Sequence, residues 1–369
     1  MILIDTPLAD PPPNYRKSNL VRSWRAWLGI AISAVFVYIA FRGQNLGDVR
    51  DALGEANLWW VPPALALYFT GVWLRATRWS ILLRPLARAD SRQLFPVVVV
   101  GYMANNVLPL RTGEIVRAYL IRRTYNVRKT SVLATIAVER LFDGFTMLGF
   151  MLVATAFVSF TSELQNLAII AFALFTCLLI GLFLLTLGGS LLDRLIQIVL
   201  GPLPVNIADR VERLASSFLS GLGVFRNRRD LLKVASLSLA AWLFEASMYY
   251  TIARGFGPVI RDAMGIAATL MTTGVANMAT LIPSSPGYIG QFEFGVKLVL
   301  NGALDVPQNQ ALAYAILVHA ALYFPITIWG VIEWSRQHLS FRQVRDEADD
   351  GDTQQPSRSE PGAVVPSGS

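Results

Sequence analysis

The chain has 369 residues, of which 54% are hydrophobic and only 15% charged, and its mean hydropathy is +0.47. A soluble domain carries about 25% charged residues, so this composition excludes an ordinary soluble globular protein. The net charge of +7 comes from basic residues between apolar runs, which is typical of cytoplasmic loops and not of a nucleic-acid-binding protein. With one cysteine and two histidines, the chain offers no disulfide and no His/Cys metal site, and we expect no metal and no cofactor.

Long apolar runs predict membrane-spanning helices, each of which needs roughly 17–25 residues. The runs are 24–41, 58–74, 132–160, 167–187, 231–253, 263–282 and 311–332. Residues 1–23 form a Pro-rich polar leader without a signal-cleavage pattern, and we expect it in the cytoplasm ahead of a transmembrane domain over 24–334. Within that domain, the segment 188–230 has amphipathic stretches typical of cytoplasmic helices at the membrane surface. Residues 335–369 include an acidic stretch rich in Pro, Ser and Gly, which predicts a disordered cytoplasmic tail.

Two shorter apolar pieces, 94–110 and 288–304, carry Pro or Gly at their edges. If 94–110 crossed the membrane, the basic residues of 111–129 and 188–233 would lie outside, against the preference of Lys and Arg for the cytoplasm. If 94–110 instead turns back at Pro109, these residues lie inside. The charge pattern therefore predicts a re-entrant hairpin. Counting the membrane crossings in the same way makes 263–304 a second hairpin, entered from the outside. It also places both termini in the cytoplasm.

The two hairpins have similar sequences, "ANNVLPLRTGEIVR" at 104–117 and "ANMATLIPSSPGYIGQFE" at 276–293. Paired Pro/Gly-interrupted segments in opposite orientations are typical of transporter sites near the middle of the membrane. Backbone broken inside a bilayer must line protein or water, so both turns should line an internal cavity. The alternative is that the prolines only kink packed helices. The predicted turn residues are Pro109, Gly113, Glu114, Pro283, Ser284, Pro286, Gly287 and Gly290.

Charged residues also interrupt the apolar helices. Glu139, Arg140 and Asp143 lie inside the run 132–160 and span about one helical turn. Arg140 with Asp143 can form a structural ion pair or contact a ligand. Glu245 and Glu293 add two further carboxylates, and Glu245, Glu293 or Glu139 could be protonated to couple movement. Candidate residues for an anionic headgroup are Asn105, Arg111, Arg117, Arg140 and Asn277. We place Arg111, Arg117 and Glu114 at the cytoplasmic rim, and Arg75 and Arg78 in the loop after the second span.

Three blocks of sequence resemble the lysylphosphatidylglycerol synthase transmembrane region, or flippase-like, family. They are "LPLRTGEIVRAYLI", "AVERLFDGFTML" and "IPSSPGYIGQFE", and "RATRWSILL" fits as well. The resemblance implies a stand-alone member that handles an anionic or polyprenyl-type lipid at the bacterial inner membrane, without an aminoacyl-transfer domain. The positions that match the family's motifs are Asn105, Pro109, Gly113, Glu114, Arg117, Glu139, Arg140, Asp143, Pro286, Gly287, Gly290 and Glu293.

These observations predict an all-α polytopic membrane protein with about six full spans and two oppositely oriented re-entrant hairpins, arranged as an inverted repeat. The leading hypothesis is a lipid translocator whose partner is the membrane lipid. One alternative is a non-transporting scaffold that binds lipid beside a separate biosynthetic enzyme. Another is an intramembrane transferase, for which Glu139, Asp143 or Glu245 could act as a base, although no catalytic constellation stands out. We expect no enzyme activity.

Overall fold

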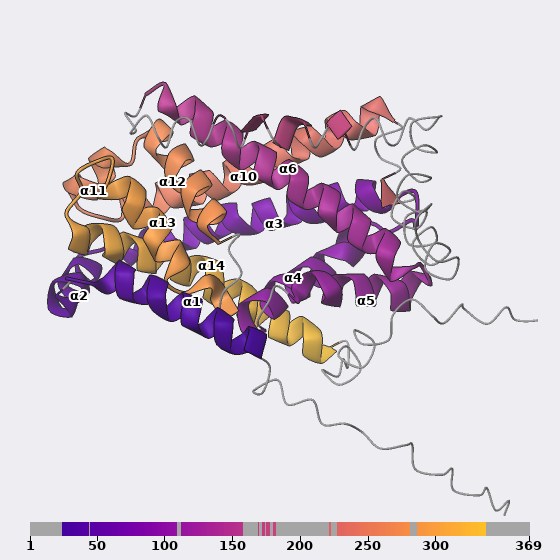
Figure 1. Cartoon of the computed structure of the whole chain (residues 1–369), viewed down its shortest axis with the longest axis horizontal. Coiled ribbons are helices and arrows are strands. Elements are labelled where there is room, and N and C mark those ends of the chain that lie inside the picture. The colour runs from indigo at the N-terminus through magenta and orange to yellow at the C-terminus, as the bar shows by residue number, and fades with distance from the viewer. Residues whose placement is uncertain are drawn as a thin grey trace, which may run out of the picture.

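The computed structural model describes residues 24–43, 45–108, 112–157, 169, 172–173, 175–177, 180–181, 221–222, 227–280 and 286–336. Every regular element among them is a helix, and most helices run along the long axis of the molecule (Figure 1). The all-α prediction is therefore confirmed for the described part of the chain. The leader 1–23, almost all of 167–187 and 188–230, and the tail from residue 337 lie outside the described residues.

Four helices are longer than the bilayer's hydrocarbon layer. They are α3 (Val61–Leu83), α6 (Lys129–Thr155), α10 (Arg228–Arg254) and α14 (Gln308–Arg336). At 1.5 Å per residue they reach roughly 34–44 Å, against a hydrocarbon thickness of about 30 Å. Of the described helices, α10 and α14 are also apolar enough throughout to count as membrane spans by composition.

The segment after α3 is a helical hairpin built from α4 (Ser91–Val107) and α5 (Gly113–Tyr125). At its closed end, the Gly113 N–H donates to Asn105 Oδ1 at 2.8 Å. At its open end, the Tyr125 hydroxyl donates to Gln93 Oε1 at 3.1 Å, which joins the last turn of α5 to the first turn of α4. The chain therefore leaves this hairpin at the end where it entered.

A second hairpin consists of α12 (Ile266–Ala279), the short 3-10 helix η4 (Pro286–Tyr288) and α13 (Gln291–Leu300). A Cβ on Gly295 would lie 2.8 Å from Ala276 Cα, so α12 and α13 pack closely because this glycine has no side chain. With 14 and 10 residues, α12 and α13 reach only about 21 and 15 Å. The two hairpins lie in opposite halves of the bundle, α4–α5 near one end and α12–α13 near the other (Figure 1).

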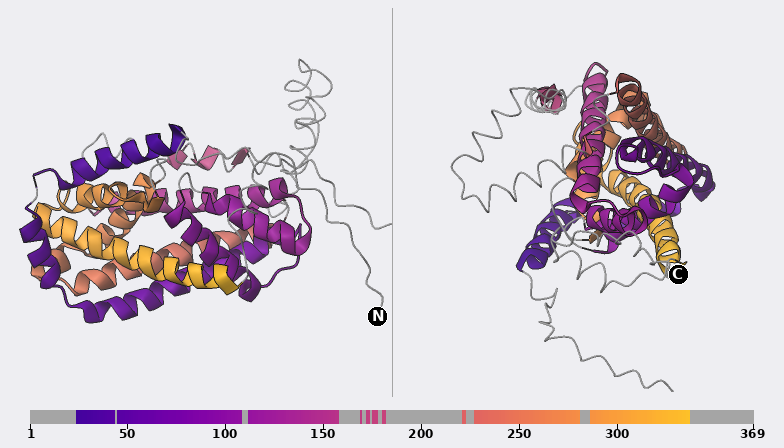
Figure 2. Two further views of the ribbon diagram at one scale, coloured as in Figure 1. Left: turned by 90° about the horizontal axis from the view of Figure 1, so that it is seen from below. Right: turned by 90° about the vertical axis from the view of Figure 1, so that its right-hand side faces the viewer.

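The turn of the second hairpin has three residues in the left-handed region: Gly287 at φ +74°, Tyr288 at +57° and Gly290 at +89°. Glycine tolerates such angles, whereas tyrosine is strained by them. A Cβ on Gly290 would lie 2.5 Å from the Val37 backbone nitrogen of α1 (Trp24–Phe41). α1 thus packs against this hairpin, and it lies at the outside of the bundle (Figure 2).

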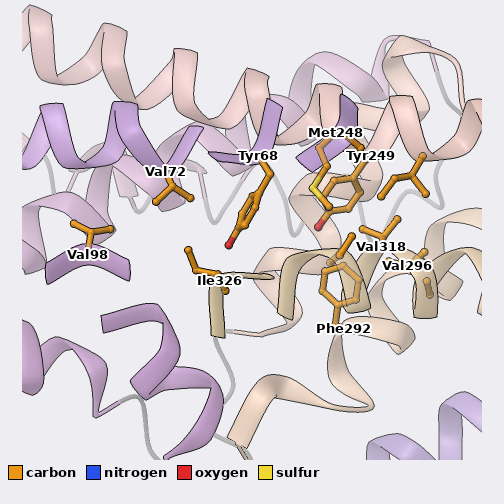
Figure 3. Packing of buried hydrophobic residues seen from close by; sticks show 14 of the residues in the cluster. Tyr68, Val72, Val98, Met248, Tyr249, Phe292, Val296, Val318 and Ile326 are labelled. Carbon is orange, nitrogen blue, oxygen red and sulfur yellow. The ribbon is translucent and has the colours of Figure 1, made fainter. Parts of the chain in front are cut away.

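The remaining elements cap the end of the bundle near the open end of the second hairpin. They are α2 (Leu46–Gly54), η2 (Leu58–Trp60) and α11 (Pro258–Ala263). The apolar core runs between α3, α10, α13 and α14, where Val72, Met248, Val296 and Val318 pack (Figure 3). α3 and α10 approach closely at Gly71, where a Cβ would lie 3.1 Å from the Ala241 carbonyl oxygen.

The structure corrects the predicted end of the second span. α3 continues to Leu83, nine residues beyond the predicted end at residue 74, so Arg75 and Arg78 belong to the helix. Their exposed fractions are 2% and 0%, so neither is a loop residue. Arginines buried among helices need carboxylate partners, and these partners lie far away in the sequence.

Candidate functional site

A pocket lined by charged, amide and aromatic side chains lies between the helices of the bundle, with a volume of about 130 Å³. We call it the central pocket. Both hairpins contribute to its wall, together with α3, α6, α10 and α14. Its lining residues are Tyr68, Arg75, Tyr102, Asn105, Asn106, Glu114, Arg140, Trp242, Glu245, Asn277, Thr280, Tyr288, Phe292, His319, Leu322, Tyr323 and Ile326.

The principal cation of the central pocket is Arg75 of α3. Its Nη2 lies 2.7 Å from Glu245 Oε2 on α10, and its guanidinium lies over the Trp242 ring at 4.7 Å. Its Nε and Nη1 make no hydrogen bond within the part of the chain that the structure describes. A buried guanidinium with unused donors is suited to an anion, because it can bind two oxygens at once.

Two phenol groups stand beside Arg75. Tyr68 is only 5% exposed, and its hydroxyl points toward Ile326 across the pocket (Figure 3). Neither Tyr68 nor Tyr102 hydrogen-bonds to another described residue through its hydroxyl. A buried hydroxyl without a partner is costly, so both groups are donors available to a ligand or to water.

Amide groups from both hairpins complete this wall. Asn277 of α12 donates to Glu245 Oε1 at 3.3 Å and to the Tyr249 hydroxyl at 3.2 Å. Asn105 of α4 uses its oxygen to accept from Gly113, which leaves its amide nitrogen for the pocket. Asn277 therefore links the second hairpin to α10, and Asn105 presents an amide nitrogen from the first hairpin.

Behind the pocket, Arg78 joins the carboxylates of α6 in a buried network. Its guanidinium lies 2.6 Å from Asp143 Oδ1 and 3.1 Å from Glu139 Oε1. Arg117 of α5 approaches Glu139 Oε2 at 2.8 Å, and the Trp242 indole donates to Asp143 at 2.9 Å. All the charged members of this network are 3% exposed or less, and each finds a partner of opposite sign. The network thus stabilises the contact between the first hairpin and the long helices.

At the edge of the pocket lie Arg140 and Glu114, whose side chains are 32% and 20% exposed. Arg140 Nε is 3.5 Å from Glu114, and Arg140 Nη1 is 3.6 Å from Asp143. These distances exceed those of the buried pairs, so Arg140 is held loosely. The predicted Arg140–Asp143 contact is present, but the closer partner of Asp143 is Arg78.

On the side of the second hairpin, His319 of α14 lies between two acceptors. Its Nδ1 is 2.6 Å from Glu293 Oε1, and its Nε2 is 2.9 Å from the Gly287 carbonyl oxygen. Glu293 Oε2 accepts from the Gly290 N–H at 2.7 Å. His319 and Glu293 therefore tie the turn of the hairpin to α14.

The structure divides the candidate residues of the sequence into groups. Asn105, Glu114, Arg140, Glu245 and Asn277 line the central pocket. Others lie beside it, in the buried network, in the hairpin turns or behind His319; they are Arg117, Glu139, Asp143, Gly113, Pro286, Gly287, Gly290 and Glu293. Outside the described residues fall Pro109, Arg111, Pro283 and Ser284.

One placement was wrong: Arg117 is not at the cytoplasmic rim. It is 3% exposed, both terminal nitrogens contact Glu139, and its guanidinium lies 4.0 Å from the centre of the Trp79 ring. Its contacts are those of a structural ion pair. We therefore do not assign it to the headgroup.

Sequence reasoning missed several pocket residues, of which Arg75 and His319 matter most. Arg75 was missed because the positive-inside rule leads one to assign an arginine near the end of a span to a cytoplasmic loop. The available signal was the i, i+3 spacing of Arg75 and Arg78, together with unpaired acids in other apolar helices. His319 gave no signal, since its partner Glu293 comes from another helix.

Comparison with known protein sequences assigns the chain to a family. AglD, a glycosyltransferase of Haloferax volcanii, is 25% identical over 82% of this chain, and the chain spans about half (52%) of AglD's length. A UPF0104 membrane protein of Methanothermobacter thermautotrophicus is 26% identical over 82% of this chain and 91% of its own length. A UPF0104 membrane protein of Methanocaldococcus jannaschii is 23% identical over 62% of this chain and 91% of its own length. The family model for the lysylphosphatidylglycerol synthase TM region matches residues 26–330, so this chain belongs to that membrane-protein family.

Proposed function

We propose that this protein binds the anionic headgroup of a membrane lipid in the central pocket and moves that headgroup between the two leaflets. The single observation that carries the proposal is the pair of unused donors on Arg75, buried at 2% exposure beside the free hydroxyls of Tyr68 and Tyr102. A phosphate or phosphodiester accepts hydrogen bonds from such donors and neutralises the cation. The acyl or prenyl chains would remain in the bilayer.

The two hairpins support movement as well as binding. Described residues beside both turns line the same pocket, and the hairpins lie in opposite halves of the bundle. α5, α12 and α13 are too short to cross about 30 Å of hydrocarbon. We infer that each hairpin is re-entrant and closes the pocket toward one leaflet. This is the arrangement expected of an alternating gate around a fixed site.

The charge distribution supports an orientation in the membrane. The end of the bundle where α5 ends and α14 ends carries Arg84, Arg88, Arg123, Arg229 and Arg336. By the positive-inside rule we place this end, and both termini, in the cytoplasm of a bacterial inner membrane.

Reconstituted protein tests the function. In phosphatidylcholine vesicles that contain a trace of fluorescent phosphatidylglycerol, we expect the label to cross faster than in empty vesicles. Excess unlabelled polyprenyl phosphate should slow the label if the site prefers that lipid class. No acceleration of either anionic lipid over empty vesicles would contradict the proposal.

Paired substitutions assign the effect to the pocket. In Arg75→Met/Glu245→Met the ion pair is removed without leaving an unpaired charge, and we expect crossing to slow by about tenfold or more, the loss of one charged hydrogen-bonding group at roughly 1.5–3 kcal/mol. The control Arg84→Met/Asp230→Met removes an exposed pair from the same two helices, α3 and α10. Equal slowing in both variants would show that the pocket has no special part.

A second candidate is a lipid-binding scaffold that presents its lipid to a separate enzyme. The observation that favours it is that the relative AglD, of which this chain covers 52%, carries the name of a glycosyltransferase. In that case the protein binds the labelled lipid, and the Arg75 variant binds it less, but the label does not change leaflet.

Neither candidate includes covalent chemistry by this chain. The four membrane carboxylates that could act as bases each contact a cation or a histidine: Glu139, Asp143, Glu245 and Glu293. A carboxylate held by an arginine is a poor proton acceptor, because its ionised form is stabilised.

A further inference from the structure

The geometry around His319 and Glu293 calls for a proton shared between the two side chains. The Gly287 carbonyl oxygen only accepts, so Nε2 of His319 carries a hydrogen at this 2.9 Å contact. Nδ1 then faces Glu293 Oε1 at 2.6 Å, where two lone pairs would repel each other. One further proton must therefore lie between these two atoms, whichever of them carries it.

This proton closes a chain of contacts around the turn of the second hairpin. The Gly290 N–H donates to Glu293, Glu293 is joined to His319, and His319 donates to the Gly287 carbonyl. The turn between these glycines includes Tyr288, a non-glycine residue in the left-handed region. Such a backbone persists only where its surroundings hold it, so the chain of contacts keeps Tyr288 at the pocket wall.

We propose that Glu293 and His319 form a one-proton site that binds a proton together with the anionic headgroup and holds the turn 286–290 closed against the central pocket. The inference rests on the proposed function for the identity of the anion. With the proton bound, the pair is neutral overall. When the proton passes to water in the pocket, a neutral histidine and a carboxylate remain, with a net charge of −1. The single ring N–H that is left can serve only one of the two acceptors, Glu293 or the Gly287 carbonyl, so one of the two contacts is lost.

The linkage follows from the position of His319 in the pocket wall. An anion beside it is repelled by the extra negative charge of the deprotonated pair, so anion and proton stabilise each other's binding. The sign is that headgroup affinity falls as the pH rises through the transition of the pair. Proton release would also free the turn, and with it one wall of the pocket.

Other titratable and charged groups near the pair have partners or lie farther along the pocket. Lys297 of α13 points away and donates to the Ala40 carbonyl of α1 at 3.1 Å. The groups on the remaining elements around the pocket are Arg75 and Tyr68 (α3), Tyr102 (α4), Glu114 (α5), Arg140 (α6), Glu245 and Tyr249 (α10), Tyr288 (η4) and Tyr323 (α14). The Phe292 ring packs against the His319 ring, with centroids 4.7 Å apart and planes tilted by 34°.

The test uses the full chain in phosphatidylcholine nanodiscs, with His338→Gln so that His319 is the remaining histidine. Nitrogen-15 NMR would follow the ring of His319 and the amide of Gly290 as the pH is raised. We expect the ring to lose one proton and the Gly290 amide to shift at the same midpoint. Short-chain phosphatidylglycerol should bind about 5- to 150-fold more weakly above that midpoint, the usual range for coupling between two sites.

The variant Glu293→Gln keeps the hydrogen bonds of the pair but removes its ability to gain or lose a proton. Its amide can donate to neutral Nδ1 and still accept from Gly290, so it mimics the proton-bound pair at every pH. In this variant we expect the Gly290 amide and the phosphatidylglycerol affinity to lose their pH dependence while binding persists. The control Glu333→Gln changes a carboxylate in the last turns of α14 that contacts Arg336. In this control the Gly290 amide and the phosphatidylglycerol affinity should depend on pH as they do in the parent chain.

The outcomes distinguish the two proposals. A Gly290 amide that ignores the His319 transition, or an unchanged pH dependence in Glu293→Gln, would overturn the one-proton site even if lipid crosses the membrane. If the His319 ring and the Gly290 amide change at the same pH but the protein never accelerates lipid crossing, the one-proton site is supported and only the proposal of transport is contradicted.

Discussion

Arg78 has the largest electrostatic role of any single side chain in the buried network. It is fully buried and contacts two carboxylates, Asp143 at 2.6 Å and Glu139 at 3.1 Å, as well as the Ser238 hydroxyl at 2.8 Å. Removing one partner of a buried pair leaves an uncompensated charge, which costs about 3–5 kcal/mol. Arg78→Met should therefore lower the free energy of unfolding by that amount, measured by denaturant titration in detergent micelles.

The matched control is Arg84→Met, which removes an arginine from the same helix. Arg84 pairs with Asp230 at 3.0 Å, but its side chain is 52% exposed, and a surface pair contributes only about 0–1 kcal/mol. The double variant Arg78→Met/Asp143→Asn removes the stranded carboxylate and keeps the Arg117–Glu139 pair, so it should recover part of the loss. A single Arg78→Met variant as stable as the control would mean that the network contributes little.

Residues within one segment could be assigned from the sequence, and residues whose partners lie elsewhere could not. The i, i+3 spacing of Arg140 and Asp143 predicted a contact that the structure contains at 3.6 Å. The stronger Arg78–Asp143 pair joins residues 65 positions apart, so no local spacing reveals it. The Arg75–Glu245 pair, 170 positions apart, shows the same limit.

At the scale of elements, Gly113 determines how closely the first hairpin closes. A Cβ there would lie 2.0 Å from the Gly101 carbonyl oxygen, a backbone atom that cannot move without shifting α4. Forcing an extra carbon into a packed contact costs about 1–3 kcal/mol. We expect Gly113→Ala to destabilise the protein by at least that much, and to open the Tyr125–Gln93 contact at the other end of the hairpin.

Gly149 supplies the comparison, because a Cβ at this position on α6 meets no atom of the described residues within 4 Å. Gly149→Ala should stabilise by roughly 0.5–1 kcal/mol, the ordinary helix preference for alanine. The two variants differ only in the position of one methyl group, so opposite signs in a thermal unfolding measurement would support close packing at Gly113. Two stabilised variants would show that α4 and α5 are farther apart.

The lengths of the helices were predictable where the apolar run alone defines them. The first run, 24–41, coincides with α1, because after Arg25 no charged residue occurs before Arg42. α3 was predicted too short, because its last turns carry arginines that are buried instead of exposed. The distribution of basic residues predicted that the chain turns back after 94–110, and α4 and α5 do form a hairpin. Its sidedness in the membrane stays a prediction.

For the whole molecule, the two ends of the bundle differ in charge. The end with the open side of the α4–α5 hairpin carries Arg88 and Arg123, whereas the opposite end mixes Arg50 and Arg261 with several acids, Asp48, Asp51, Glu55, Asp262 and Asp305. The long helices run between these ends, so charge and topology can be tested together. If both hairpins are re-entrant, residues 88 and 123 share one side of the membrane.

Cysteine labelling tests that arrangement directly. In a Cys177→Ser background, single cysteines at Arg88 and Arg123 should react with a membrane-impermeant maleimide only after the cytoplasmic face is exposed. Cysteines at Arg50 and Asp262 should react from the outside without that exposure, because α3 and α10 each cross once between the two groups. If position 123 reacted together with position 50, α4 or α5 would cross the whole membrane. The α4–α5 turn would then lie at the opposite surface, and the central pocket could not be enclosed by two hairpins from opposite leaflets.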